Sequence, residues 1–244
     1  MDNVIVTGAS RGIGLAIAKR LAREGYGVVA VARKMSPGLE EAIAEARRAG
    51  AGAIEFEALD LSDIEAIPTF VRDVRARRGA IYGLVNNAGA SAEGLLANTP
   101  NEDIEALLRL NVLSPVVLSK YVARGMMAEG RGRIVNMASI VAATGFNGLS
   151  VYAASKAALV GFTKSLAREV GRVGVTVNAV APGFIDTEMT SSMGEGDRTR
   201  IAARSALRRL AEAEDVAAMV DFLLSEGGRN ISGTVLTVDA GGTA

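Results

Sequence analysis

The residues that decide the fold are Thr7-Gly8-Ala9-Ser10-Arg11-Gly12-Ile13-Gly14, which follow a β-branched run and open an apolar-periodic stretch. Glycines in a strand-to-helix turn permit a tight turn, close approach of backbone N–H groups to a phosphate, and close helix–strand packing. The helix N-terminus also presents free amides and partial positive charge to an anion. The spacing is Gly-x-x-x-Gly-x-Gly rather than Gly-x-Gly-x-x-Gly, so a turn that only joins strand to helix is the alternative. We predict a loop that binds a dinucleotide phosphate.

Short β-branched runs alternate with longer helical patterns along the rest of the chain. Several runs are apolar at nearly every position, which is typical of strands buried on both faces of a parallel sheet. The expected strands are Asn3–Thr7, Gly27–Ala32, Ala53–Ala58, Ile81–Asn86, Arg133–Ala138, Val173–Val180 and Val235–Val238. The expected helices lie near residues 12–24, 37–49, 62–78, 101–129, 150–170 and 213–225.

This β-α order predicts an α/β fold in which residues 1–244 form a single domain. The domain is a doubly wound (Rossmann) parallel sheet of about seven strands with helices on both faces. The stretch from Pro182 to about Ala203 shows no regular pattern. A segment that long inside a compact domain is usually functional, so we expect a substrate lid at about residues 183–210.

The composition excludes several classes of site. The 244 residues include no His, Cys or Trp. Without His there is no Ser-His-Asp triad and no His-ligated zinc, and without Cys there is no thiolate metal site or redox thiol. We therefore expect no metal, and acid–base chemistry must use Tyr, Lys, Asp or Glu, or a cofactor.

The charge pattern argues against nucleic-acid and membrane partners. Lys and Arg number 27, as do Asp and Glu, so the formal net charge is zero. A general nucleic-acid binder would be basic. The charge-free run Ile134–Ser155 is interrupted by Asn, Ser, Thr and Gly, so we do not expect a membrane helix there. We expect a soluble, cytoplasmic protein.

The end of the second expected strand indicates which dinucleotide binds. Folds that take NAD place an acidic residue there, about 20 positions after the glycines, to hold the ribose 2′-hydroxyl. Here the strand ends Val31-Ala32-Arg33-Lys34, with no acid between Val28 and Gly38. Arg33, together with Arg11, suits the 2′-phosphate of NADP, although an ordinary exposed arginine is the alternative. Asp60 could contact the adenine amino group or cap the helix that follows.

Tyr152 and Lys156 are four residues apart in an expected helix, so both project from one face. An ammonium ~4 Å from a phenol contributes up to ~4 kcal/mol at an effective dielectric of ~20, or about three pKa units. Ser139 comes at the carboxyl edge of an expected strand, where ligands bind in such sheets. Its hydroxyl could hold a substrate carbonyl while the tyrosine supplies the proton. A partly buried Tyr beside a solvated Lys is the alternative.

These elements together resemble the short-chain dehydrogenase/reductase family over essentially the full length. The matching residues are Thr7-Gly8-x-x-x-Gly12-Ile13-Gly14, Asn86-Asn87-Ala88-Gly89, Asn111, Ser139, Tyr152-x-x-x-Lys156 and Pro182-Gly183. The resemblance implies that Tyr152 is the general acid in carbonyl reduction and that Ser139 polarises the carbonyl. It implies that Lys156 binds the nicotinamide ribose and lowers the tyrosine pKa. Asn111 would hold a water that links Lys156 to solvent; otherwise it is a kink residue ahead of Pro115.

We expect NADP(H) as cofactor, from the glycine loop and the resemblance together. The expected contacts are Gly8, Ser10, Arg11, Gly12, Ile13, Gly14, Arg33, Asp60, Leu61, Asn87, Ala88, Gly89, Tyr152, Lys156, Pro182, Gly183, Ile185 and Thr187.

Three stretches are similar to the 3-oxoacyl-(acyl-carrier-protein) reductases: Tyr152–Val170, Ala181–Thr190 and Ile231–Gly242. This similarity implies NADPH-dependent reduction of a 3-oxoacyl thioester to a secondary alcohol, with an acyl carrier protein as partner. The basic side chains placed to meet that carrier protein are Arg131, Arg133 and Arg172. The alternatives are an oxidoreductase for a sugar, polyol or other small secondary alcohol, and a non-catalytic dinucleotide-binding scaffold.

The helix that carries Tyr152 also bears on assembly. It is apolar nearly all round, with small residues at Ala153, Ala154, Ala157, Ala158 and Gly161. A helix apolar on every side is buried, in the core or against another subunit. The family resemblance implies a homotetramer built on this helix and its neighbour, and burial within one subunit is the alternative.

Overall fold

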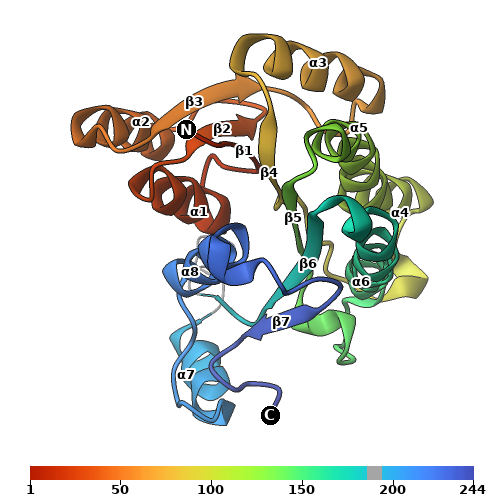
Figure 1. The fold of residues 1–244 in the computed structure, drawn as a ribbon. Coiled ribbons are helices and arrows are strands. Elements are labelled where there is room, and N and C mark those ends of the chain that lie inside the picture. The colour runs from red at the N-terminus through yellow and green to blue at the C-terminus, as the bar shows by residue number, and fades with distance from the viewer. Residues whose placement is uncertain (186–193) are drawn as a thin grey trace.

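The computed structural model describes residues 1–185 and 194–244, and these residues build one seven-stranded sheet (Figure 1). The strand order is β3-β2-β1-β4-β5-β6-β7, and every neighbouring pair is parallel. The strands are β1 (Asn3–Thr7), β2 (Gly27–Ala32), β3 (Ala53–Ala58), β4 (Ile81–Asn86), β5 (Gly132–Met137), β6 (Val175–Pro182) and β7 (Val235–Val238). The order reverses between β1 and β4, which confirms the doubly wound fold.

Helices cover both faces of the sheet, as Figure 1 shows. On one face lie α1 (Gly12–Arg23), α2 (Pro37–Ala49) and α8 (Ala213–Leu224); on the other lie α3 (Ile67–Arg78), α4 (Asn101–Leu108), α5 (Ser114–Glu129) and α6 (Ser150–Val170). The remaining helix, α7 (Glu195–Arg204), lies away from the sheet near α8.

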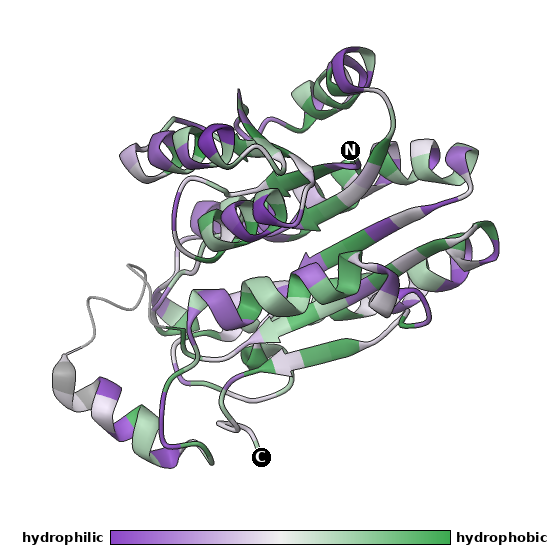
Figure 2. Cartoon of the chain, turned by 60° about the vertical axis from the view of Figure 1, so that its left-hand side comes forward, coloured by the Kyte–Doolittle hydropathy of each residue, from purple (hydrophilic) through white to green (hydrophobic). Residues whose placement is uncertain are grey.

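Apolar side chains on both faces of the strands explain this layering. In β1, Val4 and Val6 pack into the cluster beneath α1 and α8, whereas Ile5 packs into the cluster beneath α3 and α5. Successive strand residues point to opposite faces, so a strand apolar throughout requires helices on both sides. Figure 2 shows hydrophobic strands between helices whose hydrophilic residues face outward.

Several of the expected elements differ from the structure. β6 begins at Val175 rather than Val173, because residues 171–173 form a 3₁₀ turn that ends at Gly174 in the left-handed region (φ +78°). β5 starts and ends one residue earlier than expected. Within the stretch expected to be irregular, Glu195–Arg204 forms α7, while residues 186–193 of the expected lid lie outside the described residues. The helix expected from residue 62 begins at Ile67, after a 3₁₀ turn.

The expected helix over residues 101–129 is interrupted by a π-helical turn at Arg109–Leu113. This run is long and apolar enough to cross a membrane by length and composition alone, yet 44% of its most apolar window is buried. Its second half, α5, packs against β4 and β5. The placement is that of a core helix. The run Ile134–Ser155 contains most of β5, a loop and the start of α6, so it is not a spanning helix.

A chain of buried polar side chains connects β4 and β5 to the helices that cover them. Asn86 Nδ2 donates to Ser119 Oγ at 2.9 Å and to Asn136 Oδ1 at 2.8 Å. Asn136 Nδ2 donates to Thr163 Oγ1 on α6 at 2.9 Å. Buried networks of this kind specify one arrangement, because each displaced member leaves an unpaired polar group in a low-dielectric interior. The network therefore holds α6 in register with β5.

We expect Asn136→Ala to lower the free energy of unfolding by about 2–4 kcal/mol, because it removes two buried hydrogen bonds. Asn86 Oδ1 already lacks a hydrogen-bond partner in the described structure. The loss of Asn136 would therefore leave the buried Asn86 amide with still fewer hydrogen bonds. Urea unfolding followed by circular dichroism measures the loss. The exposed Asn98→Ala serves as control and should change stability by no more than about 0.5 kcal/mol. Equal losses for both variants would contradict a structural role for the network.

Candidate active site

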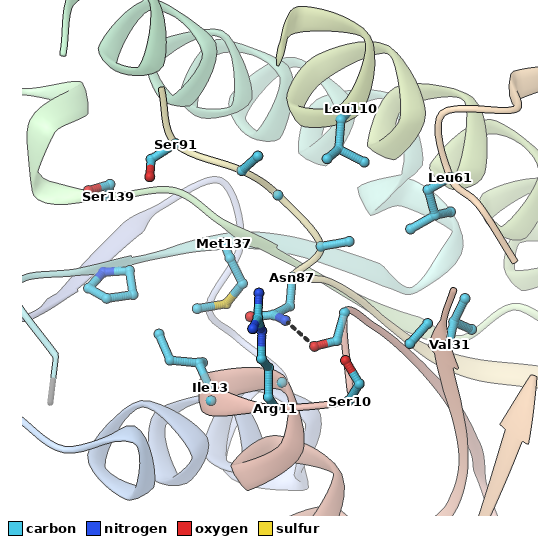
Figure 3. Close-up of a pocket in the computed structure, with 18 of the residues that line it drawn as sticks. Ser10, Arg11, Ile13, Val31, Leu61, Asn87, Ser91, Leu110, Met137 and Ser139 are labelled. Atoms are coloured by element: carbon cyan, nitrogen blue, oxygen red, sulfur yellow. Dashed lines mark hydrogen bonds between the residues drawn. The ribbon is translucent and has the colours of Figure 1, made fainter. Parts of the chain in front are cut away.

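A cleft of about 670 Å³ lies at the carboxyl edge of the sheet, where the strand order switches direction between the neighbouring strands β1 and β4. Val31 and Leu61 lie at one end, and Ser91 and Ser139 lie at the other (Figure 3). Ligands bind at this switch point in open α/β sheets because adjacent crossovers run to opposite faces and leave a crevice. The predicted site residues are therefore expected to line this cleft.

The glycine loop, residues 8–14, forms a backbone cradle with no space for a Cβ at Gly8 or Gly14. Gly8 and Gly12 both have positive φ, at +66° and +53°. A Cβ on Gly14 would lie 2.2 Å from the Gly8 carbonyl oxygen and 2.5 Å from Asn87 Nδ2. The N-cap residue of α1, Arg11, makes no side-chain capping hydrogen bond, and the first residues of the helix line the cleft. These residues fit a dinucleotide pyrophosphate, because backbone donors and the helix dipole meet there.

Thr7 and Asn87 hold that cradle against β4. Thr7 Oγ1 donates to the Val85 carbonyl and accepts from the backbone N–H groups of Asn87 and Ala88, each at 2.9 Å. Asn87 Nδ2 donates to the carbonyls of Thr7 at 2.9 Å and Gly8 at 3.3 Å. Asn87, which we predicted as a cofactor contact, lines the cleft, and its side-chain amide also donates to the glycine loop. The anchoring role of Thr7 was missed, although its position as last strand residue was a signal.

The nucleotide end of the cleft brings together residues from three predicted strand ends. Arg33 is exposed on the lining, one residue past β2. Arg11 also lines the cleft, from the glycine loop (Figure 3). Ser36 Oγ donates to the Ser10 carbonyl at 2.5 Å, which ties the Arg33 loop to the glycine loop.

Asp60 and Leu61 also line this end of the cleft. Asp60 Oδ1 accepts from the Ser62 N–H at 2.9 Å, so this carboxylate closes a turn and does not cap the following helix, since α3 begins only at Ile67. The lining further includes residues that we did not predict, all near strand ends or the π-helical turn: Val31, Ala32, Leu59, Ser62, Ala90, Ser91, Leu110, Met137 and Ala138.

Ser139, Tyr152 and Lys156 meet at the opposite end of the cleft. Ser139 follows β5, and its Oγ accepts weakly from the Val141 N–H at 3.4 Å. Tyr152 lies in the first turn of α6 and forms a hydrogen bond with Ser139. Lys156 is buried, and its Nζ donates to the Met137 carbonyl at 2.8 Å and lies 5.7 Å from the centroid of the Tyr152 ring. The geometry places two hydroxyls side by side, ready for one substrate oxygen.

Burial governs the pKa values of this pair. It raises the pKa of the Tyr152 phenol above its ordinary value of 10.0, and the hydrogen bond with Ser139 opposes that rise. Burial also lowers the pKa of Lys156 from 10.5 to about 8. The expected lowering of the phenol pKa by Lys156 is not found, because the ammonium is directed at the Met137 carbonyl and desolvation dominates. The phenol therefore stays protonated at neutral pH and is suited to donate a proton.

Asn111 lies in the π-helical turn with its side chain fully engaged. Its Oδ1 accepts from the Ala90 N–H, and its Nδ2 donates to the Ala90 carbonyl, both at 2.9 Å. Nδ2 also donates to Ser155 Oγ at 3.0 Å, and Ser155 Oγ donates to the Tyr152 carbonyl at 2.7 Å. Asn111 thus joins the loop above the cleft to the tyrosine helix. Ser155 was missed by sequence reasoning; its place between Tyr152 and Lys156 was the available signal.

The remaining predicted contacts come from the segment after β6. Pro182, Gly183 and Ile185 line the cleft. A Cβ on Gly183 would lie 2.5 Å from Asp239 Cβ, so only glycine fits between β6 and the C-terminal segment. Thr187 lies outside the described residues.

The three arginines expected to meet a carrier protein lie at the wrong edge of the sheet. Arg131 and Arg133 flank the start of β5, with guanidinium groups 4.8 Å and 5.6 Å from the Tyr82 ring centroid. Arg133 is buried, and Arg131 pairs with Asp2. Arg172 lies in the 3₁₀ turn before β6. All three are at the amino edge, whereas the cleft is at the carboxyl edge, so within this chain they do not flank the site.

Comparison with known proteins adds sequence and structural relatives. A family model described as enoyl-(acyl carrier protein) reductase matches residues 8–243. The 3-oxoacyl-(acyl-carrier-protein) reductase FabG of Pseudomonas aeruginosa is 42% identical over 241 residues, covering 97% of this chain and 95% of that protein. The protein of the same name from Escherichia coli is 40% identical over 237 residues, with the same coverage.

Solved structures agree with these relatives. A short-chain dehydrogenase from Burkholderia cenocepacia in complex with NADP superposes with a TM-score of 0.92 at 40% identity, covering 100% of this chain and 98% of that one. A structure from Beutenbergia cavernae with bound NADP, assigned provisionally as an NAD(P)-dependent gluconate 5-dehydrogenase, has a TM-score of 0.92 at 36% identity. It covers 98% of this chain and 96% of that one.

Lys156→Met should reveal the buried ammonium through the pH dependence of stability. The folded pKa of about 8 lies below the ordinary 10.5, so the unfolded chain holds the proton more tightly. Wild-type stability should therefore rise, relative to the variant, as pH increases from 7 to 10, by about 2–3 kcal/mol. Urea unfolding of both proteins at each pH measures this difference, in which other titrating groups cancel. A difference that stays constant or falls with pH would contradict a depressed lysine pKa.

Proposed function

The chain belongs to the short-chain dehydrogenase/reductase family, and we propose that it reduces the 3-oxo group of an acyl thioester on an acyl carrier protein. It is an NADP-dependent oxidoreductase. The observation that carries the proposal is the hydrogen-bonded Ser139–Tyr152 pair at the end of a cleft whose other end is a glycine cradle. A protonated phenol beside a second hydroxyl is the arrangement that a ketone oxygen requires during reduction.

The proposed cofactor site consists of backbone groups of the glycine loop and the side chain of Arg33. Gly8, Gly12 and the N-terminus of α1 would hold the pyrophosphate, and Arg33 the 2′-phosphate. Val31 and Leu61 would flank the adenine. When bound, NADPH supplies the hydride.

The chain's residues then handle the oxygen and the proton. Ser139 Oγ holds the substrate carbonyl oxygen, and the Tyr152 phenol donates its proton to that oxygen as negative charge develops. Lys156 would hold the nicotinamide ribose with an ammonium that is charged below about pH 8, while the Ser139 hydroxyl is the group that lowers the pKa of the phenol. Because the Asn111 side chain is occupied by Ala90 and Ser155, a relay water there must bind its backbone carbonyl, which a π-helical turn can leave available.

Several observations favour a ketone over the other candidate groups. The description of the family model names enoyl reduction, whereas the curated relatives are named for 3-oxoacyl reduction. Both hydroxyls are placed to act on an oxygen, which suits a ketone better than a carbon–carbon double bond. A sugar-acid ketone is the second candidate, because the Beutenbergia cavernae structure carries that assignment.

We extend the proposal to assembly and location. The small residues Ala154, Ala157, Ala158 and Gly161 are exposed on α6, and no atom lies within 4 Å of a Cβ on Gly161. Burial of this face within one subunit is therefore not what the chain shows, and a second copy could approach it closely. We propose a soluble, cytoplasmic homotetramer of single-domain subunits, each with a substrate lid at about residues 183–210.

Tyr152→Phe should lower kcat for an acetoacetyl thioester by at least about 100-fold, because the variant has no proton to donate. The loss of NADPH absorbance measures the rate, and NADPH affinity should be retained. Tyr121→Phe, on α5, is the matched control and should keep wild-type activity. Equal rates for wild type and Tyr152→Phe would rule out this residue as the acid. Turnover of 5-ketogluconate without turnover of any thioester would favour the second candidate.

Arg33→Asp should weaken NADPH binding by about tenfold or more while leaving NADH binding nearly unchanged, because only NADPH carries the 2′-phosphate. Fluorescence titration with each dinucleotide gives the two affinities. Arg48→Asp makes the same charge change at an exposed position on α2 and should affect neither. Comparable losses for both dinucleotides in Arg33→Asp would contradict the assigned contact.

A further inference from the structure

Two phenylalanine rings from separate loops meet at the carboxyl edge of the sheet. Phe146 lies in the loop between β5 and α6, and Phe184 follows β6. Their ring centroids are 5.7 Å apart and the ring planes are tilted by 56°. Phe146 remains 52% exposed despite this contact. A large apolar side chain that stays open to water next to a reactive site indicates that something apolar is bound there.

Backbone hydrogen bonds place the loops that carry both rings at the sheet edge where Ser139 and Tyr152 lie. The Ala138 N–H donates to the Val180 carbonyl at 2.7 Å, so the chain leaves β5 toward Ser139 beside the end of β6. Phe184 comes just past that end, between Gly183 and Ile185, which both line the cleft.

The other ring, that of Phe146, lies in the loop that leads into α6, the helix that carries Tyr152. The Leu149 N–H donates to the Phe146 carbonyl at 3.3 Å, and the Ala153 N–H donates to the Leu149 carbonyl at 2.7 Å. Phe146 is therefore in the turn that leads directly into the first turn of α6, where Tyr152 lies.

A third loop extends this apolar rim. The Gly94 N–H donates to the Gly148 carbonyl at 3.0 Å, which ties the loop after β4 to the Phe146 loop. Next to Gly94, Leu95 is 58% exposed and Leu96 is 56% exposed. Three of the most exposed large apolar side chains of the described residues thus lie on two loops that are joined by a hydrogen bond.

We infer that Phe146 and Phe184, together with Leu95 and Leu96 on the loop that is hydrogen-bonded to the Phe146 loop, bind the acyl chain of the substrate and set its preferred length. The inference rests on the proposed function. The reacting carbonyl must lie at Ser139 and Tyr152, and the dinucleotide cleft extends from there toward Val31. The rest of the substrate leaves on the other side, across the apolar rim. A hydroxyl-rich sugar acid would gain little from these side chains, whereas each methylene of an acyl chain would lose water-exposed surface.

The test compares acetoacetyl and 3-oxooctanoyl thioesters of N-acetylcysteamine, which have four and eight acyl carbons. We expect wild type to have the higher kcat/KM for the longer substrate. Phe146→Ala should lower that value by about tenfold, mainly through KM, and leave the shorter substrate within about twofold. Phe222→Ala, which removes a 43% exposed ring on α8, should leave both values unchanged.

Two further measurements keep the outcome decisive. NADPH affinity, from fluorescence titration, shows that each variant is folded, and Phe146→Leu should give an intermediate loss if Phe146→Ala is unstable. Equal losses for both thioesters, or no loss for either, would overturn the inference. So would dissociation of an oligomer in Phe146→Ala, since the rim would then be a subunit contact. If wild type reduces neither thioester, the proposed function itself is wrong and the inference falls with it.

Discussion

The contact between the glycine loop and the end of β4 is the constraint on which the site depends. Gly14 approaches the Gly8 carbonyl and the Asn87 amide so closely that any Cβ would overlap them. That approach brings the N-terminus of α1 to the switch point between β1 and β4, where its first residues line the cleft. Thr7 and Asn87 then connect the two strand ends by hydrogen bonds. Backbone packing therefore forms the proposed anion site, and the side chains of Thr7 and Asn87 hold its two parts together.

The reacting end depends on a different set of contacts, between α6 and its neighbours. Lys156 is held by the Met137 carbonyl of β5, and Ser155 joins the tyrosine turn to Asn111. Burial shifts the pKa of the phenol upward and that of the lysine downward, so in the chain alone both groups move toward their neutral forms. The protonated phenol is the form that an acid needs for carbonyl reduction. Because the pKa of Lys156 is about 8, a change in the charge or burial around its ammonium can change its protonation state near neutral pH.

The sequence predicted most of the fold because its signals are local. The bounds of β1, β2, β3, β4 and β7 agree with those expected, since apolar β-branched runs between glycines and polar turns mark strands clearly. α7 was missed because its ten residues, Glu195–Arg204, are largely polar and show no apolar face. The start of β6 was misplaced because the 3₁₀ turn before it ends in a β-branched residue, Val173, which extends the apparent strand pattern. Arg131, Arg133 and Arg172 come at strand starts, which all lie at the amino edge of a parallel sheet, so their distance from the cleft follows from the same rule that placed Ser139 at the carboxyl edge.

By itself, the sequence pointed to the proposed chemistry: in a chain without His or Cys, a glycine loop at the first turn and Tyr152 four residues before Lys156 favour proton transfer by a phenol. It also determined which residues come at strand ends, because those patterns span only a few positions. Tertiary structure alone decided which distant groups meet. The pairing of Asn111 with Ser155, the direction of Lys156 toward Met137 and the contact of Phe146 with Phe184 all join segments far apart in the chain. Such distances, and the burial that shifts the pKa values, arise only when helices pack on the sheet.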